Sequence, residues 1–244
     1  MRIPRICVFE ELNIGAEIKL PAQAGEHLAR VLRLERGHPI VLFNGNTREF
    51  RAEISEIAKR SVSAMILAEQ EATGRESPLH LTLAQGVARG EKMDLILQKA
   101  TELGVTRIVP LITGRTEVKL DAERTERRLA HWHAVIAGAC EQSGRVCLPA
   151  LEAPQRLAAW AAQLDSSAGL RLALDPRGEI TPRSLPHFDM ATLVVGPEGG
   201  LSEQDLSMLD QTDFIGLRLG PRILRTETAG LAAITALQAI HGDI

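Results

Sequence analysis

Two short apolar strands near the carboxyl end of this chain each run into a glycine-proline turn. Residues 193–202 have the sequence LVVGPEGGLS, and residues 217–229 have the sequence LRLGPRILRTETA. A strand that stops at such a turn and restarts as a helix leaves backbone N–H groups and an open loop at its carboxyl end. This is where open α/β sheets bind ligands. We predict that the two loops together enclose one small ligand.

The first loop favours a ligand other than a phosphate. Ser202, followed three residues later by Asp205, forms a capping-box pattern that predicts a helix over residues 203–210. A helix start attracts anions, but Glu198 places a carboxylate in the same loop, so a ligand with hydroxyls, an amine or a sulfonium suits it better. The G-x-G-x-x-G and G-x-x-x-x-G-K-[ST] nucleotide motifs are absent from the sequence. A tight turn without a ligand is the alternative interpretation.

The second loop carries two arginines directly before a long apolar helix. Arg222 and Arg225 bracket two apolar residues and lead into Thr226, Glu227 and Thr228. Either threonine could cap the helix, and Glu227 would complement its dipole. That interpretation leaves the two arginines without a role. A guanidinium in such a loop can hold a phosphate or the oxygen of a developing anion.

Other basic residues form clusters, although the formal net charge is −3. Arg30 and Arg33 belong to a predicted helix, and Arg89 and Lys92 follow a strand and open another helix. Aromatic residues make up only 3% of the chain, so any RNA would be held by phosphate contacts and shape rather than by base stacking. Solvated surface charge is the alternative for each cluster. We predict that a basic rim around the ligand site is formed by Arg89, Lys92, Arg115, Lys119, Gln142 and Arg145.

Several classes of protein fit the sequence poorly. His131 and His133 are two residues apart on a predicted helix and point to different faces, so we expect no metal site. The G-x-S-x-G elbow of many hydrolases is absent, and Cys140 belongs to the apolar stripe of its helix. An odd number of cysteines without a CxxC pair, no apolar signal core and no long apolar run lead us to expect a cytoplasmic protein away from membranes.

The pattern of elements changes near residue 75. Residues 6–71 form short strand-like runs with one helix over 25–34, which predicts a small β-barrel, with a hairpin at Asn44-Gly45-Asn46. After a polar stretch over 72–78, strands alternate with helices, which predicts a mainly parallel sheet covered by helices on both faces. The expected strands are 79–84, 107–111, 170–174, 192–195 and 215–219, and the expected helices are 92–103, 122–140, 203–210 and 227–240. We place domains at residues 1–72 and 78–244.

Together these motifs resemble the RsmE family of 16S ribosomal RNA uracil N3-methyltransferases, which belongs to the SPOUT class. The similarity extends over the whole chain and is most specific at residues 196–200 and 219–228. The resemblance implies an N-terminal PUA-like barrel for RNA and a C-terminal α/β domain folded as a deep trefoil knot. It also implies S-adenosylmethionine as cofactor and a homodimer, for which we expect residues 227–240 to be a contact surface. The implied methylated base is uracil 1498, which we expect to be modified in the assembled small ribosomal subunit.

The resemblance also suggests roles for individual residues. Arg225 would stabilise the uracil oxyanion, and Glu198 or Glu227 would accept the N3 proton. RNA would contact the basic rim together with Arg5, Arg30, Arg33 and Arg222. The cofactor would contact Leu174, Val195, Gly196, Pro197, Glu198, Gly199, Gly200, Leu217, Leu219, Gly220, Ile223, Leu224 and Thr228.

Two other functions remain open from the residues themselves. The chain could be a non-catalytic RNA-binding assembly factor, in which the glycine-proline loops are simple turns. It could also be an α/β enzyme with a different nucleotide-like cofactor. Salt-sensitive RNA binding without cofactor binding would indicate the first, and a melting temperature raised by an adenine dinucleotide would indicate the second.

Overall fold

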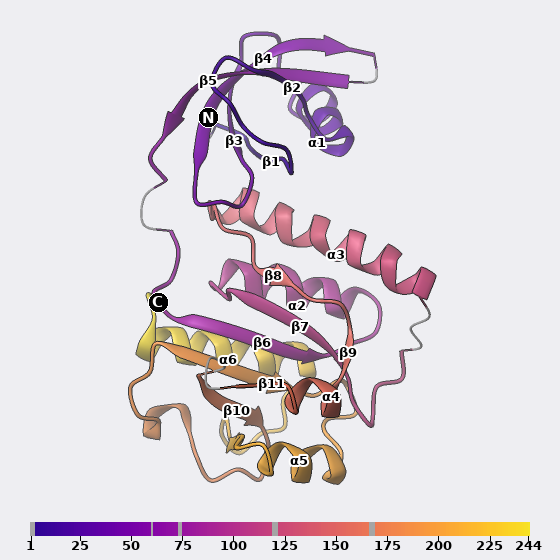
Figure 1. Cartoon of the computed structure of the whole chain (residues 1–244), viewed down its shortest axis with the longest axis vertical. Coiled ribbons are helices and arrows are strands. Elements are labelled where there is room, and N and C mark those ends of the chain that lie inside the picture. Colours follow the sequence, from indigo (N-terminus) through magenta and orange to yellow (C-terminus); the bar gives the residue numbers. More distant parts are fainter. Residues whose placement is uncertain (1–2, 60, 73–74, 119–121, 166–168) are drawn as a thin grey trace. The chain divides into compact units, whose positions relative to one another are not determined.

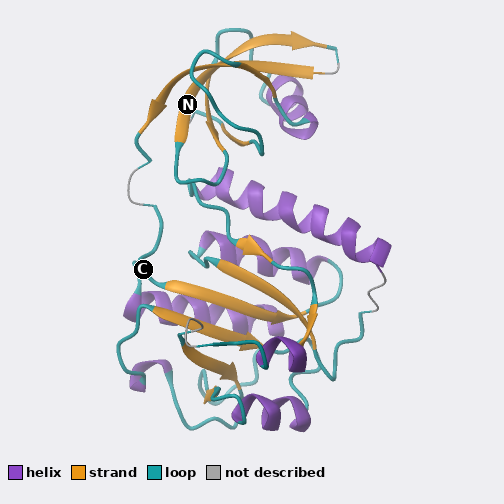
Figure 2. Cartoon of the chain, in the orientation of Figure 1, coloured by secondary structure: helices purple, strands orange, loops and turns teal. Residues whose placement is uncertain are grey.

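The computed structural model describes residues 3–59, 61–72, 75–118, 122–165 and 169–244. Contacts between residues divide the chain into two compact units, and each is described by itself. The N-terminal unit consists of residues 1–76 and 140–148, and the C-terminal unit consists of residues 77–139 and 149–244. Figure 1 labels the elements in chain order, and Figure 2 shows their secondary structure.

The N-terminal unit is built on a five-stranded sheet with the strand order β1-β3-β4-β5-β2. The turn at residues 44–46 joins β3 and β4 as an antiparallel hairpin, as the sequence predicts. Alternating apolar residues of these strands and Leu28 form one buried core. The sheet comprises β1 (Arg5–Cys7), β2 (Glu17–Lys19), β3 (Pro39–Phe43), β4 (Glu49–Ala58) and β5 (Ser61–Gln70).

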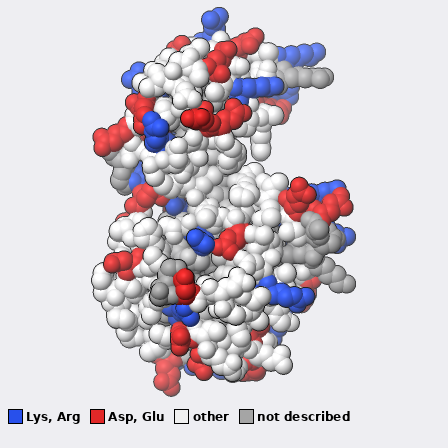
Figure 3. Space-filling view, viewed as in Figure 1, with Lys and Arg blue, Asp and Glu red and all other residues white. Residues whose placement is uncertain are grey.

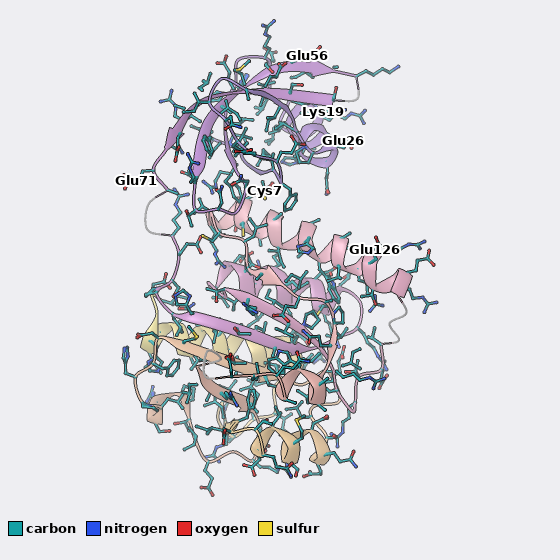
Figure 4. All side chains as sticks on the ribbon, in the orientation of Figure 1. Cys7, Lys19, Glu26, Glu56, Glu71 and Glu126 are labelled. Carbon is teal, nitrogen blue, oxygen red and sulfur yellow. The ribbon has the colours of Figure 1, made fainter. Side chains whose placement is uncertain are left out.

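The helical segment of this unit differs from the single helix predicted over residues 25–34. It begins earlier, as α1 (Ala22–Glu26), and continues as one turn of π-helix over His27–Val31. The backbone then leaves the helix at Arg33, whose φ of +52° lies in the left-handed region. In Figure 4, Glu26 lies on the surface of this unit. Cys7, also labelled there, is buried, with 3% of the residue exposed.

The C-terminal unit contains a parallel sheet with the strand order β12-β10-β11-β6-β7-β8, and β9 also pairs with β7. Every strand pair recorded in this sheet is parallel, which confirms the predicted alternation of strands and helices. Its strands are β6 (His80–Gly86), β7 (Arg107–Ile112), β8 (Ala150–Leu151), β9 (Gln155–Arg156), β10 (Leu170–Leu174), β11 (Met190–Val195) and β12 (Ile215–Leu217).

Helices cover both faces of this sheet (Figure 1). One face packs against α2 and α6, which also contact each other. The other face packs against α4 and α5 through a buried cluster that includes Trp160, Leu209 and Phe214. The helices are α2 (Glu91–Glu102), α3 (Ala122–Ser143), α4 (Leu157–Ala161), α5 (Glu203–Asp210) and α6 (Thr226–His241), with a short 3₁₀ turn at Pro182–Ser184.

Helix α3 begins in the C-terminal unit and ends in the N-terminal unit. Trp132, Ile136, Ala139 and Cys140 are buried along one side of it, as the predicted apolar stripe requires. Burial raises the pKa of the Cys140 thiol to about 12, which fits the packing role expected for this residue. Among the residues that the structure describes, no helix combines the length and the apolar character needed to cross a membrane.

Candidate functional site

The carboxyl ends of three neighbouring parallel strands open onto one cavity of about 510 Å³ in the C-terminal unit. In the sheet, β10 lies between β11 and β12, and Leu174 is aligned with Leu217. The loops that follow these three strands form the walls. Because all three strands are parallel, their loops lie at the same edge of the sheet, where ligand sites of such sheets occur.

The structure brings together at this cavity all the predicted cofactor-binding residues except Thr228. The cavity is lined by Leu174, Val195, Gly196, Pro197, Glu198, Gly199, Gly200, Leu217, Leu219, Gly220, Ile223 and Leu224. Arg115 and Arg222, which we predicted as RNA contacts, also line it. Thr228 is exposed on the first turn of α6.

The glycines of the first loop are needed because backbone segments approach one another closely. A Cβ on Gly196 would lie 2.7 Å from the carbonyl carbon of Gly200, and a Cβ on Gly86 would lie 2.6 Å from the nitrogen of Pro197. Gly200 itself has a φ of +72° and donates its N–H to the Pro197 carbonyl at 2.8 Å. The loop is therefore a compact turn, and it ends at the predicted capping box of α5.

That capping box holds the start of α5 and also a neighbouring loop. The Ser202 hydroxyl accepts the N–H of Asp205 at 3.1 Å, and the Asp205 carboxylate accepts the N–H of Ser202 at 2.9 Å. Asp205 also accepts the N–H of Gly114 at 3.2 Å, from the loop after β7. The carboxylate is buried, and these contacts compensate its loss of water.

Glu198 connects the cavity loop to the loop between β6 and α2. Its Oε1 accepts the backbone N–H of Arg89 at 3.0 Å and the ammonium of Lys92 at 3.1 Å. Partial burial acts to raise the pKa of Glu198, but hydrogen bonds from the Arg89 N–H, from its own N–H and from Lys92 outweigh it, so the pKa is lowered. The side chain is therefore ionised at neutral pH.

The structure corrects the predicted cap of the last helix. The N-cap of α6 is Arg225, and no side chain caps the helix there. Thr226 instead donates its hydroxyl to the Gly196 carbonyl at 2.6 Å and lines the cavity. Arg225 is exposed and lies between two cavity residues, Leu224 and Thr226. Glu227 is half-buried, and its Oε2 is shielded from solvent without a hydrogen-bond partner in the described part of the chain.

Sequence reasoning missed the polar wall formed by the loop after β10. Asp175, Pro176 and Arg177 line the cavity, as does Glu203 of α5. Arg177 pairs with both carboxylates, at 3.4 Å from Asp175 and 2.9 Å from Glu203, and thereby joins the β10 loop to α5. The signal was present in the sequence, because Asp175-Pro176 directly follows a predicted strand and marks a turn at its carboxyl end.

The predicted basic rim is in part engaged with acidic groups and backbone oxygens. In the C-terminal unit, Arg89 pairs with Glu117, Lys92 pairs with Glu198, and the Arg115 guanidinium donates to the Gly199 carbonyl at 2.8 Å. On the face in Figure 3, basic and acidic side chains are interspersed rather than gathered into one basic patch. Lys119 lies outside the described residues.

The remaining predicted RNA contacts belong to the N-terminal unit. Arg30 and Arg33 are exposed, and Gln142 is exposed near the end of α3. Arg5 and Arg145 are buried, which differs from the RNA contact predicted for them. Arg5 pairs with Glu49 and donates to the Arg145 carbonyl at 3.0 Å, and Arg145 pairs with Glu76 at 2.8 Å. Their guanidiniums therefore stabilise the unit from inside.

Comparison with known families assigns the chain to one of them. The sequence profile of the RNA methyltransferase domain matches residues 75–238, and the profile of the RNA methyltransferase PUA domain matches residues 20–67. The chain is 34% identical over its whole length to the ribosomal RNA small subunit methyltransferase E of Buchnera aphidicola (subsp. Schizaphis graminum), covering 98% of that protein. It is 32% identical to the protein of the same name from Bacillus subtilis, with 96% of each chain covered.

Solved structures show the same fold. A Legionella pneumophila protein described as a methyltransferase, in complex with the bound cofactor SAM, is 40% identical, with a TM-score of 0.95 and all of both chains covered. The ribosomal RNA small subunit methyltransferase E of Neisseria gonorrhoeae, bound to S-adenosyl methionine, is 37% identical, with a TM-score of 0.92 and 99% of both chains covered. This chain therefore belongs to the RNA methyltransferase family that contains the ribosomal RNA small subunit methyltransferases E.

Proposed function

We propose that this protein transfers a methyl group from S-adenosylmethionine to the N3 atom of a uridine in 16S ribosomal RNA, at uracil 1498. The observation that carries the proposal is the cavity shared by the ends of β10, β11 and β12, lined by the two glycine-proline loops. The family and its SAM-bound members support this assignment.

The residues of the cavity fit the cofactor. Leu174, Val195, Leu217 and Leu219 give it apolar walls for an adenosyl group, next to the backbone of the glycine loops. The carboxylates of Asp175 and Glu198 suit the cationic sulfonium and amino groups better than a phosphate. The cavity volume lies within the range of small-molecule sites. When bound, the cofactor supplies an electrophilic methyl group.

The protein must position the uracil, remove its N3 proton and stabilise the resulting anion. We propose that Arg225 stabilises the uracil oxyanion, since it is exposed between two cavity residues and no ion pair involving it is found among the described residues. Glu227 and Glu198 are the two candidate proton acceptors: Oε2 of Glu227 has no described partner, although only Glu198 lines the cavity. Glu198 already accepts two hydrogen bonds and is better placed to hold the loops.

Further parts of the proposal concern RNA, subunits and topology. We propose that residues 1–72 form the RNA-binding domain and residues 78–244 the methyltransferase domain, which work as a homodimer in the cytoplasm. The chain segment through the cavity loops would form the trefoil knot of the SPOUT class. In α6, Thr235, Ala239 and Ile240 are exposed and available for a dimer contact. RNA would contact Arg30, Arg33, Arg89, Lys92, Arg115, Lys119, Gln142 and Arg222.

Methyl transfer from labelled S-adenosylmethionine tests the proposal. The acceptors are small ribosomal subunits that lack the modification, naked 16S RNA, and fully modified subunits as the control. We expect label in N3-methyluridine at one site of the unmodified subunits and none in the control. Cofactor binding without transfer to either RNA would contradict the RNA substrate, and absence of cofactor binding would favour an assembly factor.

A further inference from the structure

A buried amide lies behind the cavity, where three loops meet. Gln85 is the second-last residue of β6, and it is 0% exposed. Its Nε2 lies 3.0 Å from the Gly86 carbonyl oxygen, 3.0 Å from the Thr226 hydroxyl oxygen and 3.3 Å from the Gly196 carbonyl oxygen, so its two N–H groups are shared among three acceptors. One side chain therefore joins the end of β6, the loop after β11 and the first residue of α6.

The hydrogen bonds of this group have a fixed direction. The Gly196 carbonyl can only accept, so the Thr226 hydroxyl must donate to it across their 2.6 Å contact. The Thr226 oxygen is then free to accept from Gln85, which orients the amide with its nitrogen toward the loops. Gln85 therefore donates to Thr226, and Thr226 donates to Gly196. This donor chain is buried away from water, where consecutive hydrogen bonds strengthen one another.

Close packing prevents these groups from finding other partners. The amide oxygen of Gln85 is buried without a partner among the described residues and faces Gly230 of α6, where an added Cβ would lie 3.4 Å from it. On the other side, Gly86 is pressed against the Pro197 backbone. Loss of the amide would remove the donor that it supplies to the buried carbonyls of Gly86 and Gly196.

We infer that Gln85 is a positioning residue, which sets the arginine-bearing loop against the cofactor loop; this rests on the proposed function. Gly196 lines the cavity, and Thr226 directly follows Arg225. The amide therefore fixes both the wall that holds the cofactor and the backbone that carries the proposed anion-stabilising guanidinium. It acts through these two residues and does not itself line the cavity.

The matched pair of variants Gln85→Met and Gln238→Met tests the inference in the full-length protein. Methionine keeps the length of glutamine and removes the donors. Gln238 is also 0% exposed, and it donates to the Leu103 carbonyl at 2.9 Å, but it lies away from the cavity. We expect both variants to lower the melting temperature. Only Gln85→Met should weaken S-adenosylmethionine binding in calorimetry and slow single-turnover methyl transfer at saturating cofactor, each by about tenfold.

Hydrogen exchange in the cofactor-free protein gives a readout that does not depend on activity. We expect Gln85→Met to speed exchange in residues 196–200 and 220–228, and Gln238→Met to leave these segments unchanged. Equal effects of the two variants on affinity, rate and exchange would overturn the inference. If the protein methylates no RNA, the affinity and exchange measurements still decide the role of Gln85, separately from the proposed function.

Two substitutions of Thr226, the next residue in the donor chain, test the inference even if the Gln85 variant does not fold. Thr226→Ser keeps the hydroxyl, and Thr226→Val keeps the shape without it. We expect the valine variant to bind the cofactor several-fold more weakly than the serine variant and to show faster exchange in residues 196–200. Indistinguishable serine and valine variants would contradict a donor chain through Thr226.

Discussion

The ammonium of Lys92 lies 3.1 Å from Oε1 of Glu198 and so joins the start of α2 to the loop that lines the cavity. The same oxygen accepts the backbone N–H of Arg89. A cation predicted to contact RNA and a carboxylate predicted to face the cofactor are thus direct partners. We therefore expect a substitution of either residue to alter the position of the other.

Glu198→Gln should weaken cofactor binding. The amide keeps the shape of the side chain but loses the charge that holds Lys92, so we expect the dissociation constant for S-adenosylmethionine to rise about fivefold. Because the pKa of Glu198 is lowered, its ionised form persists down to acid pH, and wild-type affinity should stay constant between pH 6 and 8. Calorimetry across this range is the measurement. Lys92→Met, which leaves the Arg89 N–H in place, should have a smaller effect, and an unchanged affinity of Glu198→Gln would contradict the holding role.

Arg225→Ala should slow methyl transfer without loss of the cofactor. Removing one donor to a developing anion typically reduces the rate by about 100-fold. Single-turnover transfer measures the rate, and calorimetry checks that cofactor affinity is retained. Arg183→Ala is the control, since Arg183 is an exposed arginine of the same unit that does not line the cavity. A normal rate for Arg225→Ala would show that another group stabilises the uracil anion.

Glu49→Ala should destabilise the N-terminal unit. Glu49 and Arg5 form an ion pair with side chains only 6% exposed, and removal of one partner leaves a buried charge that costs about 3 kcal/mol. Circular dichroism during urea unfolding is the measurement, because both tryptophans, Trp132 and Trp160, belong to the other unit. Glu69→Ala, which breaks an exposed pair with Arg48, should change stability far less. Equal losses would mean that the Arg5 pair is not buried in solution.

His241 should make the protein less stable in mild acid. Burial, followed by the charge of His187, lowers the pKa of His241, and both ring nitrogens lack partners among the described residues. The unfolded chain therefore takes up a proton at a higher pH than the folded protein. The part of the unfolding free energy that depends on neutral His241 is fully present above the usual histidine pKa near 6.5, and it declines as pH falls below that value. Melting temperatures at pH 7.5 and 5.5 should differ more for the wild type than for His241→Leu, and a parallel decline would exclude His241.

Local features of the chain were predictable because short-range rules determine them. The capping box at Ser202 and Asp205 correctly placed α5 at 203–210, and a run of apolar β-formers correctly placed β10 at 170–174. The two glycine-proline loops do line one cavity, which follows from the shared edge of parallel strands. The predicted strand over 215–219 ends at Leu217 instead, where an isolated parallel bridge to Ile180 takes up the Arg218 N–H.

Features that depend on distant partners could not be predicted. Thr226 looked like a helix cap, but its hydroxyl bonds to Gly196, thirty residues away. Arg5 and Arg145 looked like free cations, yet carboxylates far along the sequence, Glu49 and Glu76, neutralise them inside the unit. Charge and periodicity indicate which interactions a residue can make, and only the fold shows which partner it contacts.

The N-terminal unit is a discontinuous module, and this has a consequence for the order of its assembly. Glu76 accepts the backbone N–H groups of Val146 and Cys147, at 3.0 and 3.1 Å, and Arg5 donates to the Arg145 carbonyl. During synthesis, the buried charged groups of residues 1–76 therefore gain these hydrogen-bond partners only after residues 140–148 have been made. By then β6, β7 and α3 have already emerged from the ribosome. The N-terminal unit is thus completed only after the segments of the C-terminal unit that lie between its two parts have been made.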